Sequence, residues 1–175
     1  RVTALDLSAE RMERVRENLA GCRLAAECVV ADALTWEGPA GWDAVLLDAP
    51  CSATGTIRRH PDLPHVRDAA GLKDLFSLQS ALIDRALTRL RPGGRLVFAT
   101  CSLLPEEGER QVSAALARHP GLHADRAALA LPGVESRWIT AEGGLRLRPD
   151  DWPERGGMDG FYIACLRPGE GPGGH

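Results

Sequence analysis

The sequence predicts an α/β protein built on a doubly wound, mostly parallel sheet. Apolar segments of strand length alternate along the chain with longer segments of helical hydrophobic spacing, as expected for repeated β–α units. Several apolar segments are continuous runs, which is typical of parallel strands buried on both faces. Three of these runs close on an aspartate: 2–5 before Asp6, 25–31 before Asp32, and 43–47 before Asp48.

Helix signals separate the predicted strands. Ser8 suits an N-cap, and the hydrophobic spacing after it predicts a helix that stops at Gly21 as its C′ residue. A longer apolar stripe predicts a second helix over 72–90, followed by a strand over 95–100. The chain therefore passes from the third predicted strand through a helix to a fourth strand.

The C-terminal half is less regular. A third helix should open at Pro105 and run to about residue 118, with three glutamates in a first turn where the helix dipole favours anions: Glu106, Glu107 and Glu109. The stretch 121–158 should be loops with one or two short strands, and 161–166 should be a final strand.

Composition and charge exclude several classes of protein. With 175 residues, 44% of them hydrophobic and 26% charged, the chain fits one compact domain and is neither a disordered chain nor a coiled coil. A formal net charge of −3 argues against a polycationic nucleic-acid binder, but not against an enzyme with one local basic patch. No apolar run approaches the roughly 18–20 residues that span a bilayer, and no leader opens the chain. We expect a cytoplasmic protein with no membrane partner.

We expect residues 1–167 to form a single domain and the Gly/Pro-rich residues 168–175 to be a disordered tail. No glycine-rich cofactor turn precedes Asp6, although such a turn normally follows the first strand of these sheets. The first β–loop–α unit is therefore expected upstream, so the domain is incomplete at its N-terminus. A missing central strand exposes apolar sheet edges, and we expect self-association of this chain unless a partner supplies the strand.

Five cysteines show no C-x-x-C pair and no metal-ligand spacing, which predicts free thiols and no metal site. Two of them follow predicted strands: Cys51 in Asp48-Ala49-Pro50-Cys51-Ser52, and Cys101 in Thr100-Cys101-Ser102. Neighbouring strands would bring both thiols into one cleft at the carboxyl edge of the sheet, where open α/β sheets bind ligands. A thiol there becomes a nucleophile if its pKa is lowered. Position alone does not distinguish Cys51 from Cys101. The other three are expected to be packing residues: Cys22, Cys28 and Cys165.

Two further groups of polar residues are candidates for binding. The strand-end aspartates suggest one shared ligand site, although any one of them alone would be an ordinary loop residue. The segment 54–65 is irregular and locally basic, with Arg58, Arg59, His60 and His65. Such a segment either contacts phosphates or forms a solvated charged turn.

The motifs resemble those of a known family. The matching segments are 48–55 with 57–62, then 99–102 with 105–107, and finally Met158-Asp159-Gly160-Phe161-Tyr162. Together with Asp6 and Asp32 they resemble the S-adenosylmethionine-dependent RNA (cytosine-5)-methyltransferases, specifically the bacterial Sun/Fmu type that modifies small-subunit ribosomal RNA. The resemblance implies a Rossmann-like class I methyltransferase sheet with an antiparallel C-terminal strand. It implies S-adenosylmethionine as cofactor and RNA, most simply 16S rRNA, as partner.

The resemblance also implies roles for individual residues. Cys101 would attack carbon 6 of cytosine, Cys51 would assist release of the methylated base, and Asp48 would contact the cytosine edge near the methionine end of the cofactor. Asp6 would accept hydrogen bonds from the ribose hydroxyls, and Asp32 would contact the adenine amino group. Arg58, Arg59 and His60 would contact RNA phosphates beside the target base.

The chain departs from this family in lacking the glycine-rich cofactor segment and the N-terminal helical RNA-binding domain, and position 53 is Ala where relatives often have Gly. Two other functions stay open. A DNA cytosine-5 methyltransferase also uses a Pro-Cys thiol, but it lacks the second, Thr-Cys-Ser thiol. A non-catalytic or truncated RNA-binding fragment of such an enzyme is the other alternative.

Overall fold

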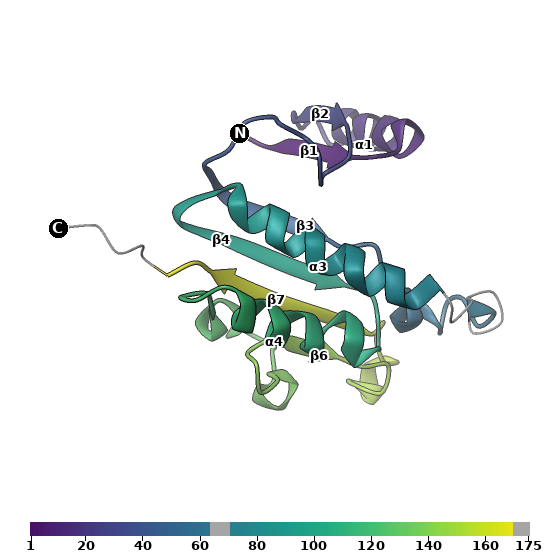
Figure 1. The fold of residues 1–175 in the computed structure, drawn as a ribbon. Helices are drawn as coiled ribbons and strands as arrows, with labels where there is room; N and C mark the ends of the chain where they lie inside the picture. The colour runs from purple at the N-terminus through teal and green to yellow at the C-terminus, as the bar shows by residue number, and fades with distance from the viewer. Residues whose placement is uncertain (64–70, 170–175) are drawn as a thin grey trace. The chain divides into compact units, whose positions relative to one another are not determined.

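The computed structural model describes residues 1–63 and 71–169. The chain divides into two compact units, Arg1–Pro39 and Ala40–His175. The expected disordered tail falls outside the described residues except for Pro168 and Gly169. Each unit contains a sheet with parallel strands and helices that follow them, so the predicted α/β class is confirmed (Figure 1).

The smaller unit is one β–α–β element. β1 (Thr3–Asp6) pairs in parallel with β2 (Glu27–Val30), and Asp6 is in register with Val30. α1 (Ala9–Gly21) connects them and begins where the sequence predicts, because the Ser8 hydroxyl oxygen accepts a hydrogen bond from the Arg11 amide at 3.2 Å. This N-cap fixes the turn that leaves β1, directly after Asp6.

The end of α1 corrects the expectation that Gly21 is its C′ residue. Gly21 is still helical, Cys22 is the C-cap, and Arg23 takes the left-handed conformation with φ of 54°. The amides of Arg23 and Leu24 close the helix onto the carbonyls of Ala20 and Leu19 at 3.1 and 2.8 Å. These two bonds satisfy the last carbonyls, and the left-handed residue that ends the helix is Arg23 rather than Gly21.

The larger unit contains a mixed sheet in the order β3-β4-β7-β5, with β6 also pairing with β7. Its strands are β3 (Trp42–Asp48), β4 (Leu90–Thr100), β5 (His123–Ala124), β6 (Leu145–Leu147) and β7 (Phe161–Arg167). β3 and β4 are parallel, and every antiparallel pair in this sheet involves β7. The antiparallel C-terminal strand implied by the family resemblance is therefore present.

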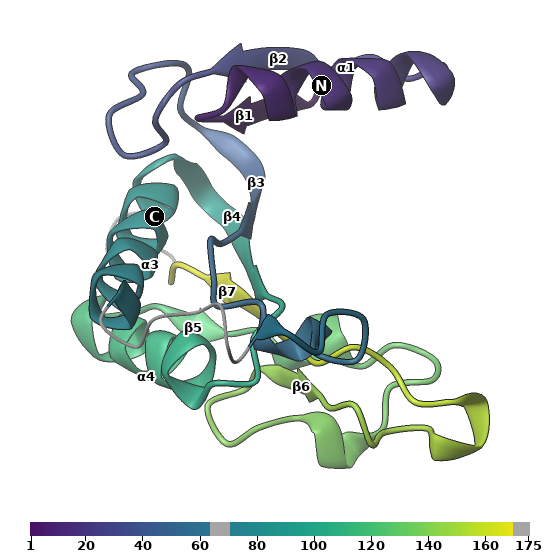
Figure 2. The ribbon, with the colours of Figure 1, turned by 90° about the vertical axis from the view of Figure 1, so that its right-hand side faces the viewer.

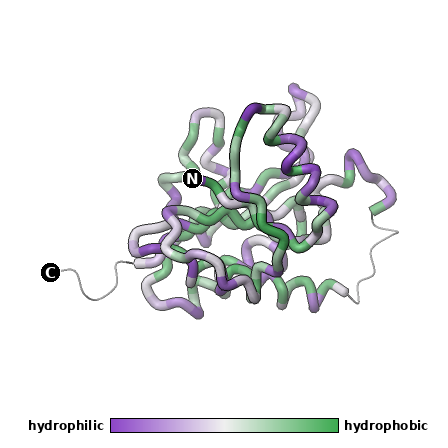
Figure 3. The backbone as a smooth tube through the Cα atoms, turned by 90° about the horizontal axis from the view of Figure 1, so that it is seen from above, coloured by the Kyte–Doolittle hydropathy of each residue, from purple (hydrophilic) through white to green (hydrophobic). Residues whose placement is uncertain are grey.

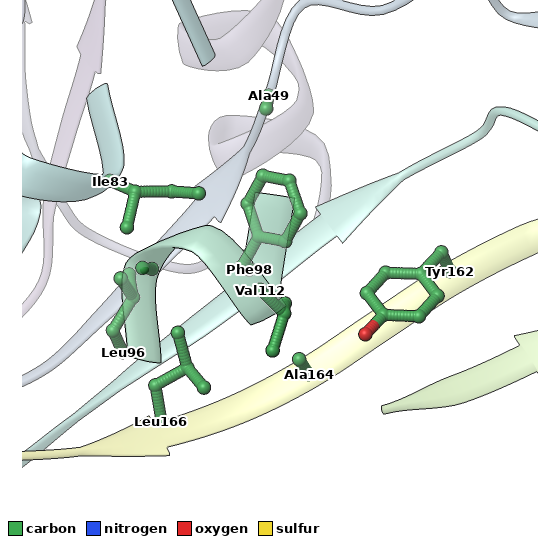
Figure 4. Close-up of a cluster of buried hydrophobic side chains, with 9 residues drawn as sticks. Ala49, Ile83, Leu96, Phe98, Val112, Tyr162, Ala164 and Leu166 are labelled. Atoms are coloured by element: carbon green, nitrogen blue, oxygen red, sulfur yellow. The ribbon is translucent and has the colours of Figure 1, made fainter. Parts of the chain in front are cut away.

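Two helices cover one face of this sheet (Figure 2). α3 (Leu72–Thr88) and α4 (Glu109–Arg118) pack on β4 and β7 through fully buried side chains. Ile83 of α3 and Val112 of α4 meet Phe98 and Tyr162 of the strands in Figure 4. Burial of each such side chain stabilises the fold by about 1.5–3 kcal/mol. This packing holds the carboxyl ends of β3 and β4 in fixed positions.

The boundaries differ from the predicted ones at two places. The predicted helix 72–90 ends at Thr88, and β4 begins at Leu90 rather than at residue 95 because its first residues pair with the start of β3 across a register shift. The predicted helix from Pro105 begins instead as a 3-10 turn over Pro105–Glu107, and α4 starts at Glu109. The reason is that Glu107 is turned into the protein, as described below.

The stretch 121–158 contains β5, β6 and three short 3-10 turns, as expected from its composition. An apolar cluster around Trp138, Leu145 and Trp152 packs against Ile163 of β7. Because Tyr162 and Ala164 point into the helix-covered core, Ile163 faces the other side of the sheet. Within the described part of the chain no helix is long and apolar enough to cross a membrane. Figure 3 shows hydrophilic and hydrophobic residues interspersed along the backbone.

Candidate active site

The two predicted cysteines lie together at the carboxyl edge of the larger sheet. Asp48 ends β3 in register with Ala99 of β4, and the Ala49 amide donates to the Ala99 carbonyl at 2.9 Å. Cys51 follows β3 by three residues and Cys101 follows β4 directly, so parallel pairing carries both to the same place. Their Sγ atoms are 3.3 Å apart. The expected juxtaposition of the thiols is therefore present.

A buried carboxylate holds the loop that carries Cys51. The side chain of Glu107 is fully buried. Its Oε1 accepts the Ser52 amide at 2.9 Å and the Gln79 Nε2 at 3.0 Å, while its Oε2 accepts the Ser52 hydroxyl at 2.5 Å. Gln79 Nε2 also donates to the Pro50 carbonyl at 2.8 Å. The residues on either side of Cys51 are thereby fixed to α3 and to the turn before α4.

Three hydroxyl groups connect the two cysteine loops. The Ser52 and Ser102 hydroxyls are 3.1 Å apart, and the Thr54 hydroxyl lies 3.2 Å from each of them. The backbone amides of Leu103 and Leu104 donate to Thr54 and Ser102 at 2.9 and 3.0 Å. Each hydroxyl has one proton to donate, and the chain of donors ends on Glu107, which as a carboxylate only accepts.

Close backbone approach brings a third segment to the thiols. The Gly55 amide donates to the Cys101 carbonyl at 2.9 Å, and the Gly160 amide donates to the Gly55 carbonyl at 2.8 Å. A Cβ atom on Gly55 would lie 2.0 Å from the Gly160 carbonyl oxygen, so only glycine fits there. Ala53, two residues earlier, adopts φ of 59°, a left-handed conformation that favours glycine. The Ala at position 53 therefore introduces local backbone strain.

The contact between the thiols shifts their pKa values in opposite directions. The hydrogen bond from Cys51 lowers the pKa of Cys101 to about 7, against the opposing effects of burial and of the Asp48 carboxylate. The same hydrogen bond, together with burial, raises the pKa of Cys51 above its ordinary value. The contact therefore favours the thiolate form at Cys101 and the thiol form at Cys51. Asp48 itself is exposed at the end of β3.

The basic segment lies beside this site with its arginines bound to the protein. Arg58 donates to the Gly156 carbonyl at 2.5 Å, and Arg59 pairs with Asp159 at 2.6 Å while remaining 61% exposed. The hydrogen bond to Asp159 is the main reason that the pKa of Arg59 is raised, and a smaller contribution comes from Cys101. His60 is exposed, and His65 lies outside the described residues.

The two remaining predicted carboxylates lie in the smaller unit, at the carboxyl edge of β1 and β2. Asp6 Oδ1 accepts the Ser8 amide at 2.7 Å, and hydrogen bonds from Arg11 lower the pKa of Asp6. Asp32 Oδ1 accepts the Leu34 amide at 2.9 Å. Arg11 donates to both oxygens of Asp6 at 2.8 to 3.1 Å, so a ligand hydroxyl would share this carboxylate with Arg11. Carboxylate oxygens accept hydrogen bonds, which is the chemistry needed to bind ribose hydroxyls or an amino group. Of the three strand-end aspartates, Asp6 and Asp32 share one sheet edge, and Asp48 shares the other with the thiols.

Sequence reasoning missed Glu107 and Asp159 as site residues. The sequence places Glu107 among the anions of a helix first turn, and the structure shows it as a buried hydrogen-bond acceptor. Asp159 pairs with Arg59 across one hundred residues of sequence. The only signal was their place inside the matching motifs. The packing role predicted for the other cysteines holds for buried Cys165, whereas Cys22 is exposed. Among residues 1–63 and 71–169 no three His, Cys, Asp or Glu side chains are grouped so as to hold a metal ion.

Solved structures place the fold of this chain among the class I methyltransferases with a Rossmann-like fold. A methyltransferase homolog protein from Pyrococcus horikoshii matches with a TM-score of 0.73 and 30% identity, covering 94% of this chain and 52% of that one. NSun6 from Pyrococcus horikoshii, solved with SFG, matches with a TM-score of 0.75 and 28% identity, covering 95% of this chain and 41% of that one.

Sequence comparison gives the family. The model of the family described as 16S rRNA methyltransferase RsmB/F matches residues 1–167. The chain belongs to this family, which confirms the resemblance drawn from the two cysteine motifs. It is 42% identical over 169 residues to the ribosomal RNA small subunit methyltransferase B of Cronobacter sakazakii, and 43% identical over 168 residues to that of Yersinia enterocolitica. The match covers 94% of this chain and 36% of each relative, so the chain spans about a third of their length.

Proposed function

We propose that this chain carries the catalytic centre of an RNA (cytosine-5)-methyltransferase that uses S-adenosylmethionine and acts on 16S rRNA in the cytoplasm. The observation that carries the proposal is the pair of thiols 3.3 Å apart at the ends of β3 and β4. The family membership supports ribosomal RNA as the substrate. We further propose that residues 1–167 act as one catalytic domain, which the family match across both units supports.

The chemistry requires a nucleophile before the methyl group can move, because carbon 5 of cytosine is only weakly nucleophilic. In the proposed first step the Cys101 thiolate bonds to carbon 6, the C5=C6 electron pair moves onto the ring, and carbon 5 becomes enamine-like. Asp48 hydrogen-bonds the cytosine edge as charge develops there. The lowered pKa of Cys101 supports this assignment, since the thiolate is the reactive form.

S-adenosylmethionine, when bound, supplies an electrophilic methyl group to carbon 5. Asp6 would hold its ribose hydroxyls, and Asp32 its adenine amino group. Release then needs loss of the carbon 5 proton, after which the C5–H electrons restore the C5=C6 bond and the C6–S pair returns to Cys101. The carbon 5 proton passes to solvent water. The Cys51 thiol lies beside the departing sulfur, and we assign it the hydrogen bond that stabilises this sulfur as it leaves as a thiolate.

Arg58, Arg59 and His60 would contact RNA phosphates beside the target cytosine. Both arginines are exposed. Arg59 pairs with Asp159, and the next residue, Gly160, is hydrogen-bonded to the loop between the two cysteines through Gly55. Phosphate contacts fix the position of the nucleic acid, whereas recognition of the base belongs to the residues around the thiols. A cytosine in structured RNA must leave its stack to reach Cys101, and a basic segment near Cys101 can hold the backbone on either side of it.

The direct test is a methyl-transfer assay with the intact protein. Labelled S-adenosylmethionine and 16S rRNA from cells that lack this modification are incubated together, and the RNA is digested for nucleoside mass spectrometry. The proposal predicts label in 5-methylcytidine. Label in another nucleoside, or in cytosine of duplex DNA, would contradict it. RNA binding without any label in cofactor-saturated reactions would favour the non-catalytic fragment instead.

A further inference from the structure

We propose that Glu107 is a positioning residue that sets the contact between the two thiols. The inference rests on the proposed thiol chemistry and adds a residue that touches neither base nor cofactor in it. Glu107 is fully buried, and it sits between the loop after β3 and the loop after β4. No other buried carboxylate of the described residues bonds to either cysteine loop.

The first part of the argument is where the carboxylate is bound. Both of its oxygens bind Ser52, the residue next to Cys51, through the backbone amide and through the hydroxyl. Two bonds from one residue fix both the position and the rotation of the Cys51 loop. Gln79 adds a third donor from α3 and ties Pro50 to the same point. The carboxylate is therefore the centre of the loop's hydrogen bonding.

The second part is how the same residue holds the other loop. The Thr100 hydroxyl, next to Cys101, donates to the backbone carbonyl of Glu107 at 3.2 Å. The Ser102 hydroxyl, on the other side of Cys101, bonds to Ser52 at 3.1 Å, and Ser52 in turn donates to Glu107. The residues on both sides of each cysteine are thus connected to Glu107 by hydrogen bonds, directly or through one other side chain. Moving this residue would change the separation of the sulfur atoms.

The third part is that the charge of Glu107 and its positioning of Cys51 change the pKa of Cys101 in opposite directions. A negative charge at Glu107 disfavours the Cys101 thiolate, whereas the Cys51 hydrogen bond favours it more strongly. Glu107→Gln removes the charge but keeps an oxygen for the Ser52 amide and an NH₂ group for the Ser52 hydroxyl. Glu107→Ala removes both the charge and the bonds. The two variants therefore separate position from electrostatics.

The experiment measures alkylation of Cys101 by iodoacetamide against pH in the intact protein, read by peptide mass spectrometry. We expect a midpoint near pH 7 in the unmodified protein, since the pKa of Cys101 is about 7. Glu107→Ala should raise the midpoint by about one pH unit toward that of a free cysteine, near 8.5. Glu107→Gln should leave it unchanged or slightly lower. Glu106→Ala is the matched control, because Glu106 lies next to Glu107 in sequence and pairs with the surface residue Arg110.

Each outcome decides the inference. If Glu107→Ala lowers the midpoint as Glu107→Gln does, the residue acts by charge and not by position. If Glu107→Ala lowers only the melting temperature and leaves the midpoint at 7, its role is merely structural. Where Glu107→Ala does not fold, Ser52→Ala removes one bond to Oε2 and should still raise the midpoint, and an unchanged midpoint there overturns the inference. kcat for methyl transfer should fall in Glu107→Ala with KM for RNA unchanged.

The alkylation profile does not depend on methyl transfer. If the unmodified protein fails to methylate RNA while the Glu107 variants shift the midpoint as expected, the proposed function is wrong and the positioning role stands. If the protein methylates RNA and the Glu107→Ala midpoint and kcat are both unchanged, the positioning role is wrong and the function stands.

Discussion

Cys51 and Cys101 are fifty residues apart in sequence, and their sulfur atoms are 3.3 Å apart at the carboxyl ends of two paired parallel strands. The contact affects the two thiols in opposite directions: it lowers the pKa of Cys101 to about 7 and raises the pKa of Cys51. A lowered pKa is what a nucleophilic cysteine needs, and a packing residue has no need of it.

The asymmetry predicts a pH dependence for each thiol. Because the folded pKa of Cys101 is depressed, its reactive thiolate is present above about pH 7 and is lost as the pH falls through that value. Cys51→Ala removes the donor and should move the alkylation midpoint of Cys101 upward, toward about 8.5. Cys51→Ser keeps a donor and serves as the control. An unchanged midpoint in Cys51→Ala would show that the thiol contact does not activate Cys101.

Cofactor affinity should depend on the carboxylates of the smaller unit. Loss of charged hydrogen bonds to the ribose or adenine costs about 1–3 kcal/mol each, so Asp6→Ala and Asp32→Ala should each weaken binding of S-adenosylmethionine by roughly 5- to 150-fold. Isothermal calorimetry of the intact protein measures this. Asp43→Ala is the control, because Asp43 is exposed and pairs with Arg91. Affinity that is unchanged in both variants would remove the assigned cofactor site.

RNA binding should lose part of its salt dependence when the basic segment is changed. Replacing Arg58 and Arg59 by alanine removes two phosphate contacts, so the slope of log affinity against log salt should fall by about 1.4–1.8. Arg110→Ala controls for net charge, since Arg110 is an exposed arginine of α4 paired with Glu106. A slope that the double variant shares with the control would identify the segment as a solvated turn.

Stability should rise when the strained Ala53 is relieved. Its left-handed conformation costs about 1–2 kcal/mol for an L-residue, and glycine removes that cost. Glycine also makes the unfolded chain more flexible, which offsets part of the gain in stability. Ala53→Gly should therefore increase the free energy of unfolding by about 0.5–1 kcal/mol in urea titration. Ala114→Gly, in the exposed helical surface of α4, should instead lower it by about 1 kcal/mol. Equal destabilisation by both changes would contradict the strain.

Most of the correct predictions depended on local sequence patterns. The strands before Asp6, Asp32 and Asp48 are continuous apolar runs, and parallel pairing then placed Cys51 beside Cys101 without further information. The role of Glu107 could not be predicted, because it depends on a contact with Ser52, 55 residues away in sequence. Its burial could not be predicted either, because Glu106 and Glu109 beside it make the segment look like a charged helix start. The left-handed Arg23 was missed for a similar reason, since Gly21 has the stronger local signal.

The assignment of roles to the two cysteines is tested most directly by covalent trapping. The intact protein and its cysteine variants are incubated with target RNA and S-adenosylmethionine, then separated by denaturing electrophoresis. Cys51→Ala should attack and methylate but fail to release, and so accumulate a protein–RNA adduct, whereas Cys101→Ala should form none. A stable adduct in Cys101→Ala would instead make Cys51 the attacking thiol, and full activity without adduct in both variants would contradict the thiol mechanism.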